Sequence, residues 1–437
     1  MRNILWLVLA LLIAYPRESK AQSVESIKAI FQSHVLNDTA FRHHFVGFAL
    51  YDPATRRMIY EHNSRRYFTP ASNTKLFSLY AGLHLLGDSI PGLRYTLRGD
   101  SLIFAGTGDP SLMHPDLSGS TLAFLRSRSE KLFLVPQKAD YEALGYGWSW
   151  DDYNESYSCE RSPLPVHGNF VRVQIPANES VARLSPAYFQ SALIADPTLP
   201  AEKGRIRRLP WDNRFYLNSL ADTTDYQADI PYHWSYATAA ALLSDSLGRT
   251  VHLLPAFADS LLDRRHYSLH ADSLYQPMLQ VSDNFFAEQI LVMAAREKGI
   301  SPDSVIHWVL DSLLSGLPDK PVWVDGSGLS RYNLFSPRDL IFLLNRLYKE
   351  VPRERLFALL PAGGVSGTIA KWYGSEKGPY VFAKTGTLSN NHNLSGYIVT
   401  KSGKVLIFSF MHNHYDLPVS RIRMAMQEVL EDIHKRY

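Results

Sequence analysis

A serine and a lysine three residues apart are the first pair in this sequence whose types and spacing suit chemistry. Ser72 and Lys75 form the only S-x-x-K of the chain. On a helix, residues at this spacing lie on one face, one turn apart. A neutral lysine amine can then accept the proton of the serine hydroxyl and make the serine a nucleophile. The alternative is a helix-capping serine followed by a surface lysine.

Two further motifs offer groups that could complete such a site. Ser282 and Asn284 belong to an S-D-N in a break between two helical patterns. The hydroxyl can relay protons and the amide can hold a substrate carbonyl, although a turn or a helix cap explains the same residues. Lys384 begins a K-T-G-T that ends an apolar, strand-like run. A cation and hydroxyls at a strand edge can bind a carboxylate, and Gly386 would let a substrate backbone come close.

Both of these motifs have a second, less suitable copy. The S-N-N that starts at Ser389 is expected in a loop before a strand, and the K-S-G that starts at Lys401 in a hairpin turn. S-x-x-K, S-D-N and K-T-G together are the motif set of serine β-lactamases and penicillin-binding proteins. The copies at Ser72, Ser282 and Lys384 lie in the settings this chemistry needs, which are a helix start, a loop between helices and a strand.

Lys75 can act as a base only if its pKa falls. A free lysine has a pKa near 10.4, so a base near neutral pH needs a drop of about 3 units, or about 4 kcal/mol. Desolvation and the neighbouring cation Lys384 are expected to supply this drop. We therefore expect Lys75 to be buried and largely neutral.

The elements that hold these motifs follow from the periodicity of apolar residues. Helical spacing from Leu76 to Leu86 predicts that Ser72 stands at the start of a largely buried helix. Between residues 88 and 235, short strand-like runs alternate with turns, which predicts a β-rich insertion. The simplest fold is α+β, with a discontinuous domain of antiparallel sheet and helical cluster at 22–87 and 236–437. Strands are expected at 46–51, 57–61, 380–384, 394–400 and 405–411, and helices at 23–35, 236–247, 285–298, 302–314, from Ser336 and at 418–434.

Composition narrows the function classes. The 437 residues include 45 basic and 42 acidic side chains, for a net charge of +3, which is too small to indicate nucleic-acid binding. Cys159 is the only cysteine. A single cysteine excludes both an intrachain disulfide and a multi-thiolate metal site.

The first 21 residues have the pattern of a secretory signal peptide. Arg2 precedes an apolar run at residues 4–15 that is short for a membrane span, and Ser19 and Ala21 suit cleavage before Gln22. An uncleaved membrane anchor is the alternative. No other segment approaches 18 consecutive apolar residues. We expect an exported, periplasmic protein without a transmembrane span after cleavage.

Beyond the three motifs, the sequence resembles the class C low-molecular-mass penicillin-binding proteins. These are exported D-alanyl-D-alanine carboxypeptidases and endopeptidases. The resemblance covers nearly the whole mature chain, and the insertion is shorter than in the largest members. It implies a serine β-lactamase/transpeptidase-like fold, peptidoglycan stem peptides as substrates, β-lactam antibiotics as acylating inhibitors, and no metal or organic cofactor. Further matching segments are G-x-G-D-P-x-L at 106–112, a tryptophan and acid segment at 147–152, D-G-S-G-L-S at 325–330, and Gly367-Thr368.

The resemblance also implies catalytic roles. Ser72 would be the acylated nucleophile and Lys75 its base. Ser282 would pass a proton to the leaving D-alanine, while Asn284 would position the peptide. Lys384 would lower the energy of the charged states.

Substrate-binding roles are implied in the same way. Thr385 and Thr387 would bind the terminal carboxylate, beside Gly386. The backbone N–H groups of Thr387 and of the nucleophile would form the oxyanion hole. Asp152, with Tyr157, would reach from the insertion to the free amine of the stem peptide, although a turn-capping acid explains Asp152 equally well.

Two other functions stay open at this point. A serine β-lactamase would acylate in the same way and lose the acyl group rapidly to water. Class A β-lactamases place a deacylating glutamate in an E-x-x-L-N segment, which this sequence lacks. A catalytically silent peptidoglycan-binding protein would have no need of the complete motif set, and hydrolysis of a D-Ala-D-Ala peptide distinguishes it from a carboxypeptidase.

Overall fold

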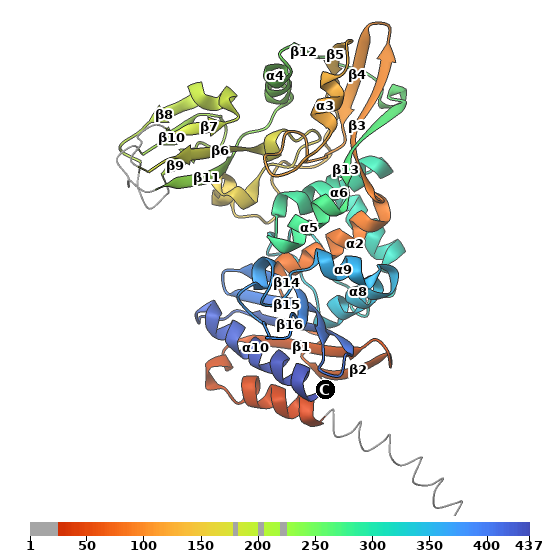
Figure 1. Cartoon of the computed structure of the whole chain (residues 1–437), viewed down its shortest axis with the longest axis vertical. Helices are drawn as coiled ribbons and strands as arrows, with labels where there is room; N and C mark the ends of the chain where they lie inside the picture. The colour runs from red at the N-terminus through yellow and green to blue at the C-terminus, as the bar shows by residue number, and fades with distance from the viewer. Residues whose placement is uncertain (1–24, 178–181, 200–204, 219–224) are drawn as a thin grey trace, which may run out of the picture.

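The computed structural model describes residues 25–177, 182–199, 205–218 and 225–437. The expected signal peptide therefore lies outside the described residues. An antiparallel sheet in the order β14-β15-β16-β1-β2 joins the two ends of the chain, because β1 pairs with β16 (Figure 1). This pairing confirms the strands predicted for the discontinuous domain. They are β1 (Phe45–Asp52), β2 (Arg57–His62), β14 (Val381–Leu388), β15 (Asn391–Val399) and β16 (Val405–Asn413).

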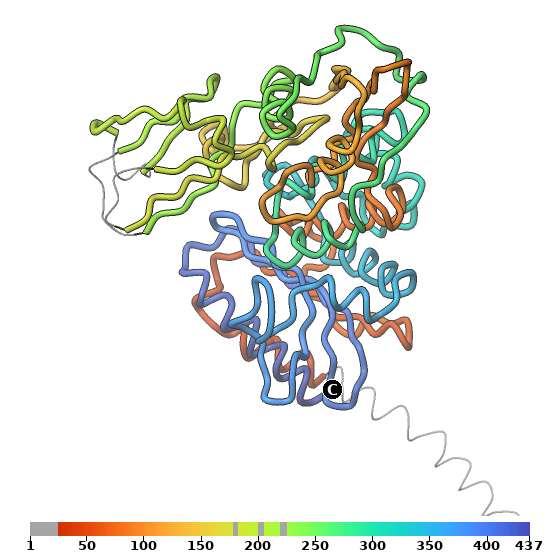
Figure 2. Tube along the Cα trace, turned by 45° about the horizontal axis from the view of Figure 1, so that its top comes forward, coloured from red at the N-terminus to blue at the C-terminus, as the bar shows by residue number. Residues whose placement is uncertain are grey.

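Both faces of this sheet are covered. Along β16, Phe408 and Phe410 belong to one hydrophobic core, whereas Ile407 and Met411 belong to another. Successive side chains of a strand point to opposite faces, so the strand supplies both cores. Helix α10 (Val419–Arg436) and the helical segment that ends at Leu36 cover the first face, and these two ends of the described chain lie together in Figures 1 and 2.

A helical cluster covers the second face. At its centre is α2 (Lys75–Leu85), in which every residue from Lys75 to Gly82 is buried. A helix that is apolar on all sides belongs inside a core, and α2 packs against α6 (Asn284–Lys298). The helix predicted from Ser336 begins there with a capping box and a first-turn proline. The remaining helices are α5 (Asp272–Gln280), α7 (Pro302–Trp308), α8 (Pro337–Glu350) and α9 (Arg353–Leu359).

The described residues of the inserted region, together with β12 and β13, form one five-stranded and two three-stranded sheets. They have the strand orders β12-β5-β4-β3-β13, β11-β6-β7 and β8-β10-β9. The last two form an arm that projects from the helical cluster (Figures 1 and 2). The elements of the inserted region and of the segment that follows it, up to His270, are β3 (Ser89–Arg98), β4 (Ser101–Gly106), α3 (Thr121–Arg126), β5 (Lys131–Leu134), β6 (Phe170–Ile175), β7 (Arg183–Ser185), β8 (Leu193–Ala195), β9 (Ile206–Arg208), β10 (Phe215–Leu217), β11 (Tyr226–Pro231), α4 (Tyr236–Leu247), β12 (Val251–Leu253) and β13 (Arg264–His270).

The packing of the residues that follow the expected boundary at residue 235 favours a later end of the insertion. Helix α4 was expected in the catalytic domain, but its Leu242 and Leu243 pack in the same core as Phe104 of β4 and Val171 of β6. Strand β13 pairs with β3. Helical periodicity shows that a segment is a helix and does not show which core it joins. We therefore propose that the insertion extends to His270.

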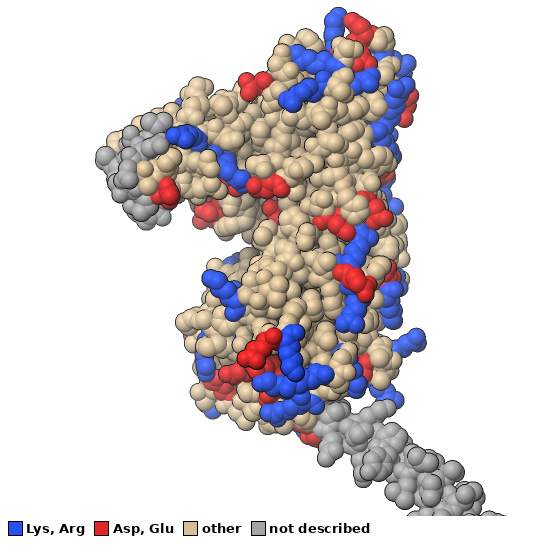
Figure 3. All heavy atoms as spheres, in the orientation of Figure 1, with Lys and Arg blue, Asp and Glu red and all other residues tan. Residues whose placement is uncertain are grey.

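Figure 3 shows a recess between the projecting arm and the lobe that carries β14 to β16. Among the described residues, no helix is both long enough and apolar enough to cross a membrane.

Candidate active site

Ser72 lies in a single 3-10 turn, Ala71–Thr74, which leads directly into α2. The turn is held against β14 by Asn73, whose Nδ2 donates to the carbonyl oxygen of Lys384 at 3.1 Å. Gly386 permits this contact, because a Cβ atom there would lie 2.3 Å from the carbonyl oxygen of Pro70. The close approach expected at this glycine is thus made by the protein's own chain.

Lys75 ends among three oxygen atoms. Its Nζ lies 2.7 Å from Oγ of Ser72, 2.7 Å from Oδ1 of Asn284 and 2.7 Å from the carbonyl oxygen of Ser327. Amide and carbonyl oxygens only accept hydrogen bonds, whereas a hydroxyl also donates. A neutral amine has two N–H groups and one lone pair. When Lys75 is neutral, its N–H groups therefore meet Asn284 and Ser327, and its lone pair faces the hydroxyl proton of Ser72.

The electrostatics of the two lysines favour this neutral form. Burial lowers the pKa of Lys75 to about 8, while Asp283, Asp325 and Glu288 raise it. The burial and the lowered pKa expected for Lys75 are both present, and at this pKa about a tenth of Lys75 is neutral at pH 7. The pKa of Lys384 is lowered well below its usual value by burial and then by the Lys75 cation. Burial is thus the main cause of the lowered pKa of Lys75, whereas repulsion by the Lys75 cation contributes to the lowered pKa of Lys384.

Ser282 and Lys384 form a second serine–lysine pair. Ser282 lies in the loop between α5 and α6 with a φ of 65°, a backbone conformation that is uncommon for residues other than glycine. Its Oγ is 2.8 Å from Nζ of Lys384, which also donates to the carbonyl oxygen of Thr385 at 2.9 Å. A hydroxyl held by a buried amine is suited to proton transfer.

The hydroxyls of the K-T-G-T each have a partner. Oγ1 of Thr385 lies 2.7 Å from Oγ1 of Thr368, and Oγ1 of Thr387 lies 2.8 Å from Nδ1 of His392. Thr387 is exposed, whereas His392 is buried directly opposite it on β15. Sequence reasoning did not identify His392, because it belongs to none of the motifs.

The insertion reaches the site through Asp152 and Tyr157. The Tyr157 hydroxyl donates to Oδ1 of Asp152 at 3.1 Å, and the Tyr157 carbonyl oxygen accepts from Nδ2 of Asn284 at 3.0 Å. Because a carbonyl only accepts, this contact turns Oδ1 of Asn284 toward Lys75. The insertion therefore fixes the orientation of a residue that holds Lys75.

These residues surround one cleft of about 520 Å³. Ser72, Ser282 and Asn284 lie on its wall, whereas Lys75 and Lys384 are fully buried behind it. Among the ranges that the structure describes, no group of three or more His, Cys, Asp or Glu side chains is arranged to hold a metal ion. The cleft is also lined by Gly147, Ser149, Asp152, Tyr157, Gly328, Leu329, Arg331, Thr387, Leu388 and Ser389.

Known proteins are similar to this chain in sequence and in fold. The chain is 27% identical over 447 residues to a D-alanyl-D-alanine carboxypeptidase of Actinomadura sp. (strain R39), covering 91% of this chain and 82% of that protein. It is 25% identical to the D-alanyl-D-alanine carboxypeptidase DacB of Haemophilus influenzae, covering 85% of each. The crystal structure of penicillin binding protein 4 (dacB) from H. influenzae superposes with a TM-score of 0.74 at 22% identity, over 94% of this chain and 99% of that one.

These similarities confirm the expected α+β fold and the resemblance drawn from the motifs. The model of the D-Ala-D-Ala carboxypeptidase 3 (S13) family matches residues 30–196 and 250–433, so the match covers most of the chain and leaves out part of the projecting arm. The chain belongs to the D-Ala-D-Ala carboxypeptidase 3 (S13) family of serine peptidases.

Proposed function

We propose that this enzyme is an exported carboxypeptidase that removes the terminal D-alanine from peptidoglycan stem peptides through an acyl-enzyme on Ser72. A D,D-endopeptidase activity on crosslinked peptides is part of the same proposal. The observation that carries it is the set of three oxygens around Lys75, which leaves the lone pair of the neutral amine for the proton of Ser72.

In the acylation step, Ser72 attacks the carbonyl of the penultimate D-alanine and gives its proton to Lys75. The backbone N–H groups of Ser72 and Thr387 stabilise the oxyanion. Collapse of the tetrahedral intermediate expels the terminal D-alanine. Its amine takes the proton of the Ser282 hydroxyl, beside Lys384, and Ser282 regains a proton from the Lys75 cation, so that the proton of Ser72 ends on the leaving amine and both side chains return to their starting states. Water then hydrolyses the acyl-enzyme and restores Ser72.

Substrate recognition divides between the two regions that form the cleft. The exposed hydroxyl of Thr387 and the hydroxyl of Thr385 bind the terminal carboxylate, next to the buried amine of Lys384. From the insertion, Asp152 and Tyr157 reach the free amine of the stem peptide. Penicillins acylate the same serine, a proposal supported by a homologous H. influenzae structure described as complexed with a novel β-lactam.

Release of D-alanine from a peptide that ends in D-Ala-D-Ala tests this function. Wild-type enzyme should release one D-alanine per peptide, and Ser72→Ala and Lys75→Met should release none. Thr55→Ala, on the turn between β1 and β2, serves as the matched control and should retain activity. No release by the folded wild-type protein would contradict the proposal. The amino-terminal sequence of protein recovered from the host envelope tests export, and should begin at Gln22.

A further inference from the structure

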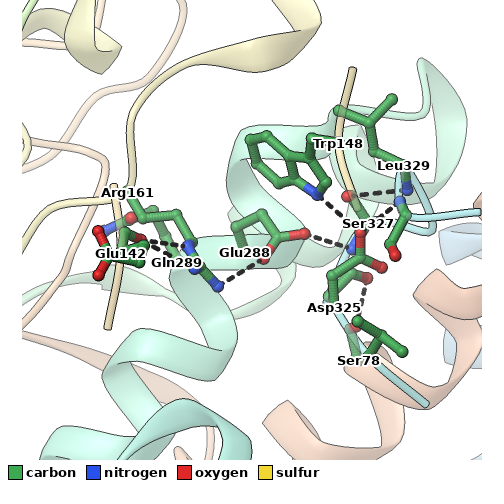
Figure 4. A network of polar contacts seen from close by, with 12 residues as sticks. Ser78, Glu142, Trp148, Arg161, Glu288, Gln289, Asp325, Ser327 and Leu329 are labelled. Atoms are coloured by element: carbon green, nitrogen blue, oxygen red, sulfur yellow. Dashed lines mark hydrogen bonds and ion pairs between the residues drawn. The ribbon is translucent and has the colours of Figure 1, made fainter. Parts of the chain in front are cut away.

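Glu288 is a fully buried carboxylic acid with no role in the reaction described above. It lies one helical turn after Asn284 on α6, on the side of the helix that faces Ser327. Its Oε1 accepts a hydrogen bond from the backbone N–H of Ser327 at 2.8 Å (Figure 4). The carbonyl oxygen of that same residue is one of the three oxygens that hold Lys75. Glu288 thus acts on Lys75 through a single residue.

The partner of Glu288 comes from the insertion. Nη1 of Arg161 lies 3.5 Å from Oε2 of Glu288, and the two side chains are 8% and 0% exposed. Nε and Nη2 of Arg161 donate to the carbonyl oxygen of Glu142 at 3.2 and 2.8 Å, which fixes the guanidinium from the other side (Figure 4). This is a buried ion pair between the insertion and the helix that carries Asn284.

Geometry favours the ionised form of Glu288. Its Oε2 has no hydrogen-bond partner, so the O–H of a protonated acid would be buried without an acceptor, which is unfavourable. The carboxylate instead faces the Arg161 cation. Burial and then Asp325 raise the pKa of Glu288 above its usual value, and Arg161 acts in the opposite direction. The charge on Glu288 therefore depends on its partner from the insertion.

A second connection reaches the same segment. Nε1 of Trp148, also in the insertion, donates to Oδ2 of Asp325 at 2.9 Å. The Asp325 carboxylate in turn accepts from the backbone N–H groups of Gly328 and Ser330 at 2.9 and 2.7 Å. The insertion therefore reaches the segment around Ser327 through two carboxylates. Glu288 accepts from the N–H of Ser327 itself, and Asp325 accepts from the N–H groups of Gly328 and Ser330.

We propose that the inserted region positions Lys75 and holds a negative charge behind it, through the Arg161–Glu288 ion pair and the backbone of Ser327. Arg161 and Glu288 are positioning residues, since neither lines the cleft. The inference rests on the proposed function only for the role of Lys75 as the base. It assigns the insertion a part in setting up the catalytic lysine.

Several charges act on Lys75 from the elements packed around it. Asp283 at the N-cap of α6, Glu288 on α6 and Asp325 on the neighbouring segment raise the pKa of Lys75. Lys384 on β14 is the other ionisable group beside Lys75, and its own pKa is lowered by burial and then by the Lys75 cation. Replacing Glu288 by the isosteric glutamine removes one negative charge and keeps an oxygen that can accept from Ser327. The pKa of Lys75 should then fall by about one unit.

The test is a direct titration of Lys75 in the full-length mature protein. Lysine labelled with ¹³C at Cε reports the charge of its own amine by NMR, and the Lys75→Met variant assigns the signal. Glu288→Gln should titrate about one pH unit lower than wild type. Arg161→Met should shift by the same amount, because the unpartnered Glu288 then takes up a proton. The double variant should shift no further than either single variant.

Arg265→Met is the matched control. Arg265 pairs with Glu297 at the other end of α6, so this variant loses an ion pair to the same helix and should leave the titration of Lys75 unchanged. If Arg161→Met does not fold, Arg161→Gln replaces it and should give the same shift. An unchanged pKa of Lys75 in folded Glu288→Gln, or additive shifts in the double variant, would overturn the proposal.

Acylation by benzylpenicillin gives a second readout. Its pH profile should move to lower pH in Glu288→Gln by the same amount as the titration, whereas a purely structural role would lower the rate without moving the profile. A wild-type protein that benzylpenicillin does not acylate would contradict the proposed function alone. The NMR titration would still decide the role of the ion pair in that case.

Discussion

Acylation of Ser72 should accelerate with pH, because only neutral Lys75 can accept the serine proton. Burial lowers the pKa of Lys75 to about 8. The neutral fraction is then about one half at pH 8, about a tenth at pH 7 and about a hundredth at pH 6. The second-order rate constant for acylation should therefore rise about tenfold per pH unit below pH 8 and level off above it.

A fluorescent penicillin measures this profile directly. The rate constant is taken from labelling at low penicillin concentration between about pH 6 and about pH 9, at constant ionic strength, because this quantity reports the pKa of the free enzyme. Labelling carried to completion should reach one penicillin per chain at every pH, which separates slow acylation from loss of folded enzyme. A flat profile, or a limb centred near the ordinary lysine pKa of about 10.4, would refute the argument that Lys75 is a buried base.

Three further predictions follow from individual contacts. The folded state binds fewer protons at Lys75 than the unfolded state between about pH 8 and about pH 10.4, so its unfolding free energy rises with pH. In urea unfolding, wild type should gain about 1 kcal/mol over Lys75→Met between pH 7 and pH 9, and no gain would contradict the lowered pKa. Asp152→Asn should lower kcat/KM about tenfold for stem peptides with a free amine and leave penicillin acylation unchanged, and equal losses would rule out amine recognition. His392→Phe removes the partner of Thr387 and should raise KM several-fold at nearly constant kcat, whereas His392→Asn, which keeps a donor, should restore it. An unchanged KM in His392→Phe would show that the Thr387 hydroxyl needs no support.

The helices and strands whose apolar residues recur at a regular spacing were predictable from the sequence. The helix from Tyr236 to Leu247 and the five strands of the catalytic sheet occur close to their expected bounds, because apolar spacing reflects which face an element buries. The end of the insertion could not be predicted in this way. The residues of α4 have helical spacing in either core, and only the packing of Leu242 against the inserted sheets decides the domain to which it belongs.

In the site, the motif residues that act through their side chains were predictable from the sequence, and residues that act through their backbone were not. Ser72, Lys75, Ser282 and Lys384 have side chains with distinctive chemistry at short, recognisable spacings, and the structure brings them together. Ser327 was predictable only as part of a D-G-S-G-L-S segment, because it contributes a backbone carbonyl, which every residue has.

Contacts between segments that lie far apart in the sequence could not be predicted from it. Glu288 and Arg161 lie 3.5 Å apart and come from segments widely separated in the sequence. An acidic residue in an apolar helical pattern indicates a buried carboxylate that needs a partner, but the sequence does not show which residue is that partner. His392 is another such case, because its relation to Thr387 depends on the register of β14 and β15.

The most direct test of the central claim is the intact mass of the mature protein after incubation with benzylpenicillin. Wild type should gain the mass of one penicillin, and peptide mapping should locate it on Ser72. Ser72→Ala should gain nothing, and wild type should also release D-alanine from a D-Ala-D-Ala peptide. An adduct on another residue, or one that persists in folded Ser72→Ala, would contradict the account. Rapid turnover of penicillin without a lasting adduct would identify a β-lactamase instead.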